Sequence, residues 1–194
     1  MTAAVDADVD AVIVNAADSA CVPIMKLAKQ LELRAQVYLV GACAGEEILD
    51  AAGADAEGII YSGEGPADPD DLEGMIYDEV VARYATGPAQ AAGTVGFRGF
   101  MNLYGAFVEI GYDNLTSENI LNHMRSAVDV PSFWGHPYTC DGQRIPGLPA
   151  LCAPEQTLFT TTGVPGEDIV FLPEDFADTG GWIETDDLYA AAFG

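Results

Sequence analysis

Basic residues are scarce in this chain of 194 residues, with seven lysines and arginines against 31 aspartates and glutamates and a formal net charge of −24. Nucleic-acid binding depends on clustered Lys and Arg side chains that neutralise phosphates. The excess of acid therefore argues against a nucleic-acid partner, and equally against a passive role on an anionic membrane surface. The acidic residues are spread along the whole chain, as is typical of a solvated surface.

Several other signals are missing. No run of about 18 apolar residues could cross a membrane, and the acidic residues 1–10 lack the apolar core of a signal peptide. Only two histidines are present, His123 and His136, and they lie too far apart in sequence to predict a metal site or a proton relay. No nucleophile or phosphate-binding motif occurs either. We therefore predict no enzyme, no catalytic residue, no metal and no cofactor.

What the chain does contain is an alternation of short apolar runs and amphipathic segments. The runs at residues 11–14, 37–40 and 58–61 predict parallel strands buried on both faces, because each is short and almost entirely apolar. Helices are expected between them, at residues 19–31 and 45–52. This pattern is typical of the α/β class, with a three-layer doubly wound parallel sheet.

The middle of the chain predicts helices instead. A Gly/Pro/Asp stretch from residue 63 is expected to cross between lobes, and Asp68 is expected to cap a helix that ends near residue 85. A second helix is predicted at residues 94–110 and a third at 117–128. The apolar stripe of the first comprises Leu72, Ile76, Val80 and Tyr84. That of the second comprises Phe97, Phe100, Met101, Tyr104, Phe107 and Val108.

Three glycines interrupt the second of these helices, and each weakens it by about 1 kcal/mol relative to alanine. Gly96, Gly99 and Gly105 therefore suggest close packing against another element. Residues 131–154 are irregular, and strand-like runs follow at 156–162 and 168–172. These boundaries divide the chain into residues 1–62, 63–157 and 158–194.

Four cysteines are present and none forms a CxxC pair. Cys140 and Cys152 bracket a loop rich in Gly and Pro, where a disulfide would contribute on the order of 3 kcal/mol. Cys21 and Cys43 each follow a predicted strand and could also meet. Four reduced, partly buried thiols are the alternative.

The order of these segments resembles the C-terminal half of type I periplasmic substrate-binding proteins, the leucine/isoleucine/valine-binding group of ABC transporters. DAVIVNAADSACVPIMKLAKQLELRAQVYLVG is similar to a strand, long helix and strand of the family's second lobe. ILDAAGADAEGIIYSGEGP, GTVGFRGFMNLYGAFVEIG and LTSENILNHMRSA follow in the family's order. The resemblance covers nearly the whole chain and implies a partial two-lobe fold of this type.

The resemblance also implies a function. It is that of an extracytoplasmic solute-binding component, with a transporter permease as partner and a small polar solute such as a branched-chain amino acid or related amide. A ligand-sensing receptor module shares the fold, and an α/β enzyme is a further alternative. The residues that the resemblance places at the ligand follow predicted strands: Ala17, Asp18, Ser19, Gly41, Ala42, Cys43 and Glu64. Helix capping is an equal alternative for Asp18 and Ser19.

One departure from the family is large. The family's first lobe, whose Ser and Thr hydroxyls and backbone amides hold the ligand carboxylate, has no counterpart in this sequence. A two-lobe clamp gains affinity by enclosing its ligand. We therefore expect this chain alone to bind a solute weakly, and we expect aromatic side chains of residues 94–110 to promote association.

Overall fold

The computed structural model describes residues 1–16, 18–65, 71–87, 93–145, 147–162, 170–172, 181–185 and 191. They belong to two compact units. The first lies within Met1–Gly63 and Thr157–Gly181, and the second within Glu64–Ala89, Gly93–Gln156 and Trp182–Gly194. Within these described residues, no helix is both long and apolar enough to cross a membrane.

The first unit is built on a sheet whose first three strands are parallel. β1 (Ala11–Val14) pairs with β2 (Gln36–Val40), and β2 pairs with β3 (Ile60–Gly63). This confirms the predicted α/β order. β3 begins two residues later than expected, because Gly58 adopts a positive φ of 76°, which belongs to a turn rather than a strand.

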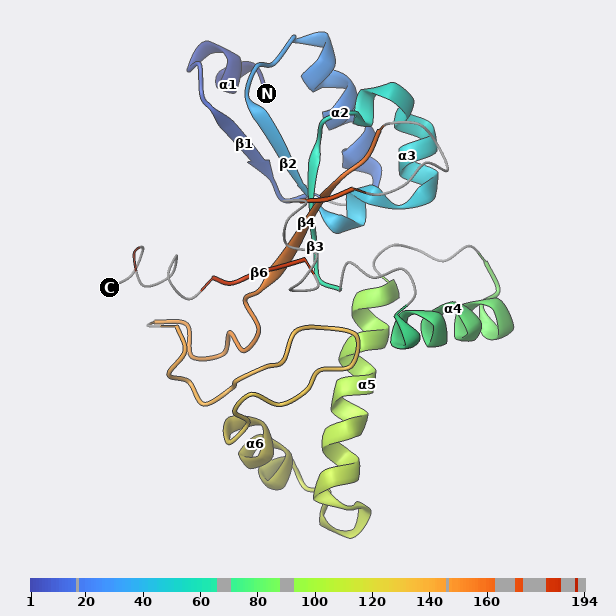
Figure 1. Ribbon diagram of the computed structural model, residues 1–194, viewed down its shortest axis with the longest axis vertical. Coiled ribbons are helices and arrows are strands. Elements are labelled where there is room, and N and C mark those ends of the chain that lie inside the picture. The colour runs from blue at the N-terminus through green and yellow to red at the C-terminus, as the bar shows by residue number, and fades with distance from the viewer. Residues whose placement is uncertain are drawn as a thin grey trace. The chain divides into compact units, whose positions relative to one another are not determined.

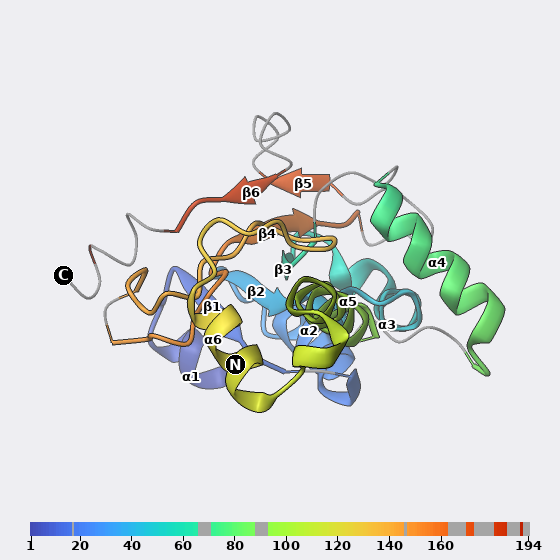
Figure 2. The ribbon, with the colours of Figure 1, turned by 90° about the horizontal axis from the view of Figure 1, so that it is seen from below.

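Two further strands extend this sheet with the opposite direction. β4 (Gln156–Thr160) pairs antiparallel with β3, and β5 (Val170–Leu172) pairs antiparallel with β4. Figure 2 shows β4 and β5 side by side with opposed arrows. Both strands were predicted within longer runs. Of the second run, only its last three residues form a described strand.

Two helices connect the parallel strands and lie beside each other (Figure 1). α2 (Cys21–Gln30) follows a short 3-10 turn, η1 (Asp18–Ala20), and α3 (Glu46–Ala52) lies between the turns η2 (Gly41–Ala44) and η3 (Gly53–Ala56). A short helix before β1, α1 (Thr2–Asp6), was not expected from the sequence. The core joins α2, α3 and the sheet through Cys21, Met25, Ala28, Val37, Leu39, Cys43, Ala52, Ala56, Ile59, Tyr61 and Phe159.

The prediction that the strands are buried on both faces is wrong for β1. Its Ala11 is exposed, and the side chain of Ile13 is 82% exposed. Along β2, only the alternate residues Val37 and Leu39 are buried in the core. The strands follow one another across the sheet in chain order, and right-handed crossovers then place both connecting helices on the same face.

Tyr61 is the largest fully buried side chain of this core. Its ring stacks on Phe159 with centroids 5.4 Å apart, and its hydroxyl lies 3.9 Å from the sulfur of Met25. Burial raises the pKa of Tyr61 to about 12, although a hydrogen bond with Thr161 opposes the shift. The phenol therefore stays neutral within the apolar core at physiological pH.

The second unit contains the predicted helices, α4 (Leu72–Tyr84), α5 (Gly93–Ile110) and α6 (Ser117–Arg125), with the turn η4 (Tyr112–Asn114) and a two-residue strand, β6 (Trp182–Ile183). Asp71 caps α4 by accepting hydrogen bonds from the backbone of Glu73 and Gly74. The predicted cap, Asp68, lies outside the described residues. α6 is capped by Thr116 and ends earlier than expected.

The predicted apolar stripe of α4 is wrong, because Leu72, Ile76 and Tyr84 are exposed. Tyr77 is buried instead. Its ring packs against Phe97 of α5, with centroids 5.3 Å apart, and against Trp134, with centroids 5.6 Å apart. Aromatic packing across elements thus decides which face of α4 is buried.

The irregular segment around Trp134 is fixed by polar side chains of both helices. Glu73 of α4 accepts a hydrogen bond from the backbone N–H of Trp134. Asn102 of α5 accepts from the N–H of Phe133 at 2.7 Å and donates to the carbonyl of the same residue at 3.3 Å. This reciprocal pairing satisfies backbone groups that have no helix or strand partner.

The glycines of α5 do not mark close packing. A Cβ built at Gly96, Gly99 or Gly105 has no described heavy atom within 4 Å, so the prediction from these glycines is wrong. They face open space, as do Phe100, Tyr104 and Val108 on the same helix, which are exposed.

Substituting one of these glycines should therefore stabilise the chain. We expect Gly99→Ala to raise the free energy of unfolding by about 1 kcal/mol, because alanine restricts the unfolded backbone and meets no clash in the helix. Gly74→Ala in α4 is the contrasting control, since its Cβ would lie 3.1 Å from Nε1 of Trp134. Urea unfolding of both variants tests this, and a destabilised Gly99→Ala would show that this face of α5 is covered in solution.

All four cysteines are paired in the structure. Cys21 of α2 is bonded to Cys43 of η2, with their Cα atoms 5.4 Å apart. Cys140 is bonded to Cys152, with a Cα separation of 4.6 Å. Cys140 also belongs to a small second apolar cluster with Ala127 and Tyr138. The first disulfide thus lies in the core of the first unit, and the second links two positions of the irregular segment in the second unit.

Candidate functional site

The carboxyl ends of β1, β2 and β3 meet at one edge of the sheet, because these strands are parallel. Open α/β sheets bind ligands at this edge. The chain leaves β1 through Asn15 and η1, and it leaves β2 directly into η2. A Cβ at Gly41 would collide with the carbonyl oxygen of Ser62, so η2 approaches the end of β3 closely. Only a residue without a side chain fits there.

The structure places the predicted ligand residues of the first loop as follows. Ala17 and the side chain of Asp18 lie outside the described part of the chain. Ser19 is exposed within η1. The N-cap of α2 is Ala20, which makes no side-chain capping bond, so Ser19 does not cap that helix. Its hydroxyl is thus accessible at the sheet edge.

The three predicted residues of the second loop differ in accessibility. Gly41 and Ala42 are partly exposed in η2. The side chain of Cys43 is fully buried and bonded to Cys21, and its sulfur lies 3.4 Å from the carbonyl oxygen of Ala16. A buried disulfide sulfur has no hydrogen to donate, so the side chain of Cys43 is not available to a ligand.

Glu64, the remaining predicted residue, belongs to the second unit. Its carboxylate accepts a hydrogen bond from Nη2 of Arg98 at 2.5 Å, and its carbonyl oxygen accepts one from Nη1. Burial lowers the pKa of Arg98, and the charge and hydrogen bond of Glu64 oppose this shift. The only sequence signal for this pair is a single arginine in a mostly apolar helix.

Arg98 is one of few cations in this acidic chain and is held tightly. Its guanidinium also lies 6.0 Å from the ring centre of Trp134. Its Nε atom is buried, and among the described residues it has no hydrogen-bond partner. The guanidinium therefore interacts mainly with Glu64 and Trp134, and it is not free to bind the carboxylate of a ligand.

A second polar cluster lies elsewhere in the second unit and was not expected from the sequence. Glu155 is fully buried at its side chain and forms a bidentate pair with Arg144. Its Oε2 also lies 3.2 Å from Nδ1 of His136, and Nε2 of that ring lies 3.3 Å from Oε1 of Glu184. A cavity of about 340 Å³ opens beside His136 and Arg144, and its other lining residues are Asp129, Pro137, Thr139, Asp141 and Gln143.

The ring of His136 also makes a packing contact. It meets the ring of Trp182 edge-on, with centroids 5.5 Å apart. Its two carboxylate neighbours were not foreseen, because Glu155 and Glu184 follow it by 19 and 48 positions in a chain with 31 acidic residues.

Comparison with known proteins identifies the fold. No protein-family profile and no curated sequence matches the chain significantly. Among solved structures, a leucine-binding protein of Thermotoga maritima superposes with a TM-score of 0.63 at 15% identity. The superposition covers 96% of this chain and 48% of the leucine-binding protein. A fatty acid ABC transporter substrate-binding protein of Thermomonospora curvata gives a TM-score of 0.66 at 16% identity, over 88% of this chain and 44% of its own.

A third structure of this kind contains a ligand. The branched-chain amino acid ABC transporter protein of Thermus thermophilus, solved with bound valine, has a TM-score of 0.58 and 16% identity, over 91% of this chain and 50% of its own. The chain thus has the fold of type I periplasmic binding proteins. It spans about half the length of the structures that it matches.

Proposed function

We propose that this chain is part of a solute-binding component of an ABC transporter, acting outside the cytoplasm together with a transporter permease. The solute is small and polar, such as a branched-chain amino acid or a related amide. The observation that carries the proposal is the fold, because the structures that superpose on 84–96% of the chain are named as proteins of this kind.

The chemistry of the sheet edge supports the same proposal. Binding an amino acid needs hydrogen-bond donors for its carboxylate, oxygen acceptors for its ammonium group, and an apolar contact for its side chain. Around the ends of β1 and β2, the first unit presents the hydroxyl of Ser19 and the partly exposed backbone of Gly41 and Ala42. The hydroxyl of Ser19 can donate a hydrogen bond to a carboxylate and accept one from an ammonium group.

Blocking this edge should weaken binding. We expect calorimetry with leucine, isoleucine, valine and their amides to detect weak binding by the 194-residue chain. Ala42→Phe should weaken it by at least about tenfold, equivalent to 1.4 kcal/mol, because a bulky ring at this partly exposed residue would cover the chain that follows β2.

The matched control is Ala54→Phe, which places the same ring at an exposed residue of η3, before β3 rather than after β2. It should retain wild-type affinity, and circular dichroism of both variants checks that they are folded. The proposal fails if none of these solutes binds, or if the two variants bind equally well.

A further inference from the structure

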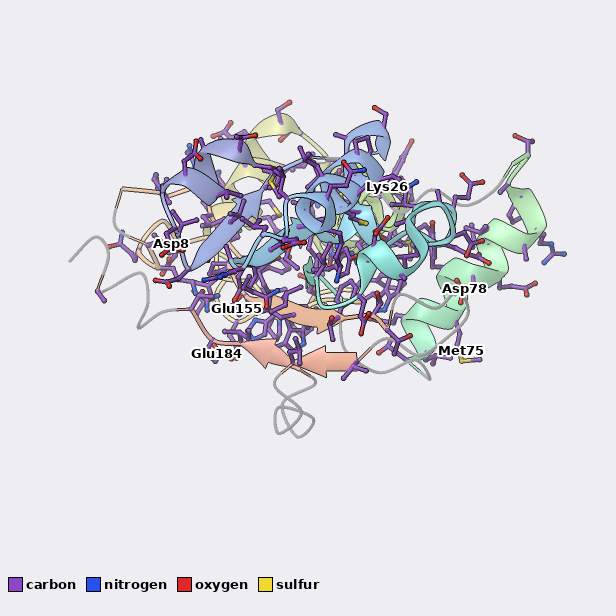
Figure 3. All side chains as sticks on the ribbon, turned by 90° about the horizontal axis from the view of Figure 1, so that it is seen from above. Asp8, Lys26, Met75, Asp78, Glu155 and Glu184 are labelled. Carbon is purple, nitrogen blue, oxygen red and sulfur yellow. A yellow bond between two sulfur atoms is a disulfide. The ribbon has the colours of Figure 1, made fainter. Side chains whose placement is uncertain are left out.

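The cluster of His136, Glu155 and Glu184 combines ligand types that suit a divalent metal. One ligand atom from each residue lies within 4.8 Å of the other two. Figure 3 shows Glu155 and Glu184 close together. All three residues belong to the second unit, so the cluster is independent of the proposed solute site at the sheet edge.

The surroundings of His136 determine which ring nitrogen is free. Nδ1 lies 2.9 Å from the carbonyl oxygen of Pro137 and 3.2 Å from Oε2 of Glu155. Both neighbours are acceptors, so we assign the proton of the neutral ring to Nδ1. A histidine that binds metal through one nitrogen commonly donates its other N–H to a carbonyl or carboxylate in this way.

This tautomer leaves two acceptors facing each other. In this neutral tautomer, the lone pair of Nε2 faces Oε1 of Glu184 across 3.3 Å. Two acceptors at this distance are held together only by a cation between them, which is either a second proton on the ring or a metal ion. Two ligands bound at about 2.1 Å to one tetrahedral zinc ion are about 3.4 Å apart, which is close to the spacing observed here.

Glu155 is suited to a supporting role rather than to direct ligation. Its side chain has no exposed surface, and Arg144 pairs with both of its oxygens. It therefore holds the imidazole through Nδ1. Glu184, in contrast, is 70% exposed and free to adjust to an ion. The adjoining cavity, lined in part by Asp129 and Asp141, leaves room for the water ligands that would complete the coordination.

We propose that Nε2 of His136 and the carboxylate of Glu184 bind a divalent transition-metal ion of the zinc type, and that Glu155 and the carbonyl of Pro137 orient the imidazole. Imidazole nitrogen and carboxylate oxygen together suit this class of ion. The carboxylates of Glu155 and Glu184 and the guanidinium of Arg144 leave one net negative charge at the cluster, which a divalent ion would reverse. With two protein ligands, the site exchanges its ion readily.

The test is calorimetry of the metal-free full chain at pH 7.5 with zinc chloride, alongside calcium chloride as a probe of diffuse binding to surface carboxylates. We expect one zinc ion per chain, and at least a tenfold loss of zinc affinity in both His136→Gln and Glu184→Gln. Glu184→Gln should fold as the wild type does, because this exposed side chain is not needed for packing. A loss of zinc affinity in this variant is therefore not explained by misfolding.

The matched control is His123→Gln, which removes an imidazole that lies 3.5 Å from the exposed carboxylate of Glu109. It should leave zinc affinity unchanged. The proposal is overturned if the wild-type chain binds no zinc, if Glu184→Gln binds zinc as tightly as wild type, or if His123→Gln loses affinity to the same extent. The first result would mean that a proton, not a metal, lies between His136 and Glu184.

Discussion

Replacing Cys21 and Cys43 together by alanine should lower the free energy of unfolding by about 3–4 kcal/mol. The bond closes a segment with a sequence separation of 22 residues, so its loss frees a long loop in the unfolded chain. Both cysteines are also fully buried in the core, where they join α2 to η2. Guanidinium unfolding of the wild type and of the double variant measures the difference.

Cys140→Ala/Cys152→Ala is the comparison for this prediction. These two cysteines have a sequence separation of only 12 residues, and they belong to the small apolar cluster of the second unit. We expect a smaller loss, of about 3 kcal/mol or less. Alkylation of the unreduced wild-type protein, followed by mass spectrometry, checks the premise. Labelled thiols at Cys21 and Cys43, or an unchanged unfolding midpoint in their double variant, would contradict the prediction.

The sequence predicted the sheet of the first unit well because its strands carry their signal locally. The residues of β1 form a short apolar run, mostly of β-branched side chains, that is bounded by polar residues, and its limits agree with the structure. The start of β3 was misplaced, because the apolar run does not reveal that Gly58 turns with a positive φ. The exposure of Ile13 was missed for a different reason. The order of the strands in the sheet decides which face the helices cover, and that order cannot be read from β1 alone.

The second unit shows where local patterns stop being informative. Leu72, Ile76 and Tyr84 have helical spacing, yet Tyr77 is the buried residue because Phe97 and Trp134 surround it. Those partners are distant in sequence, so no window along α4 contains the deciding contact. The pairing of His136 with Glu155 and Glu184 is likewise a product of the fold, with no spacing that predicts it.

Removing the partner of the buried carboxylate should destabilise the chain strongly. We expect Arg144→Met to lower the free energy of unfolding by about 3–5 kcal/mol, because it leaves the charge of Glu155 buried without its bidentate partner. His136 lies 3.2 Å from the same carboxylate, but in its neutral form it offers only one N–H in place of a full positive charge. Urea unfolding at pH 7 provides the measurement.

Two further variants decide whether the buried charge is the cause. Arg144→Met/Glu155→Met removes both charges, and it should recover most of the stability that the single substitution loses, since a buried ion pair contributes little beyond an apolar pair of similar volume. Glu109→Gln, which removes the exposed carboxylate that pairs with His123, should change stability by no more than about 1 kcal/mol. If the double variant is as unstable as Arg144→Met, the loss comes from packing around the arginine, and the carboxylate of Glu155 is not the group that needs compensation.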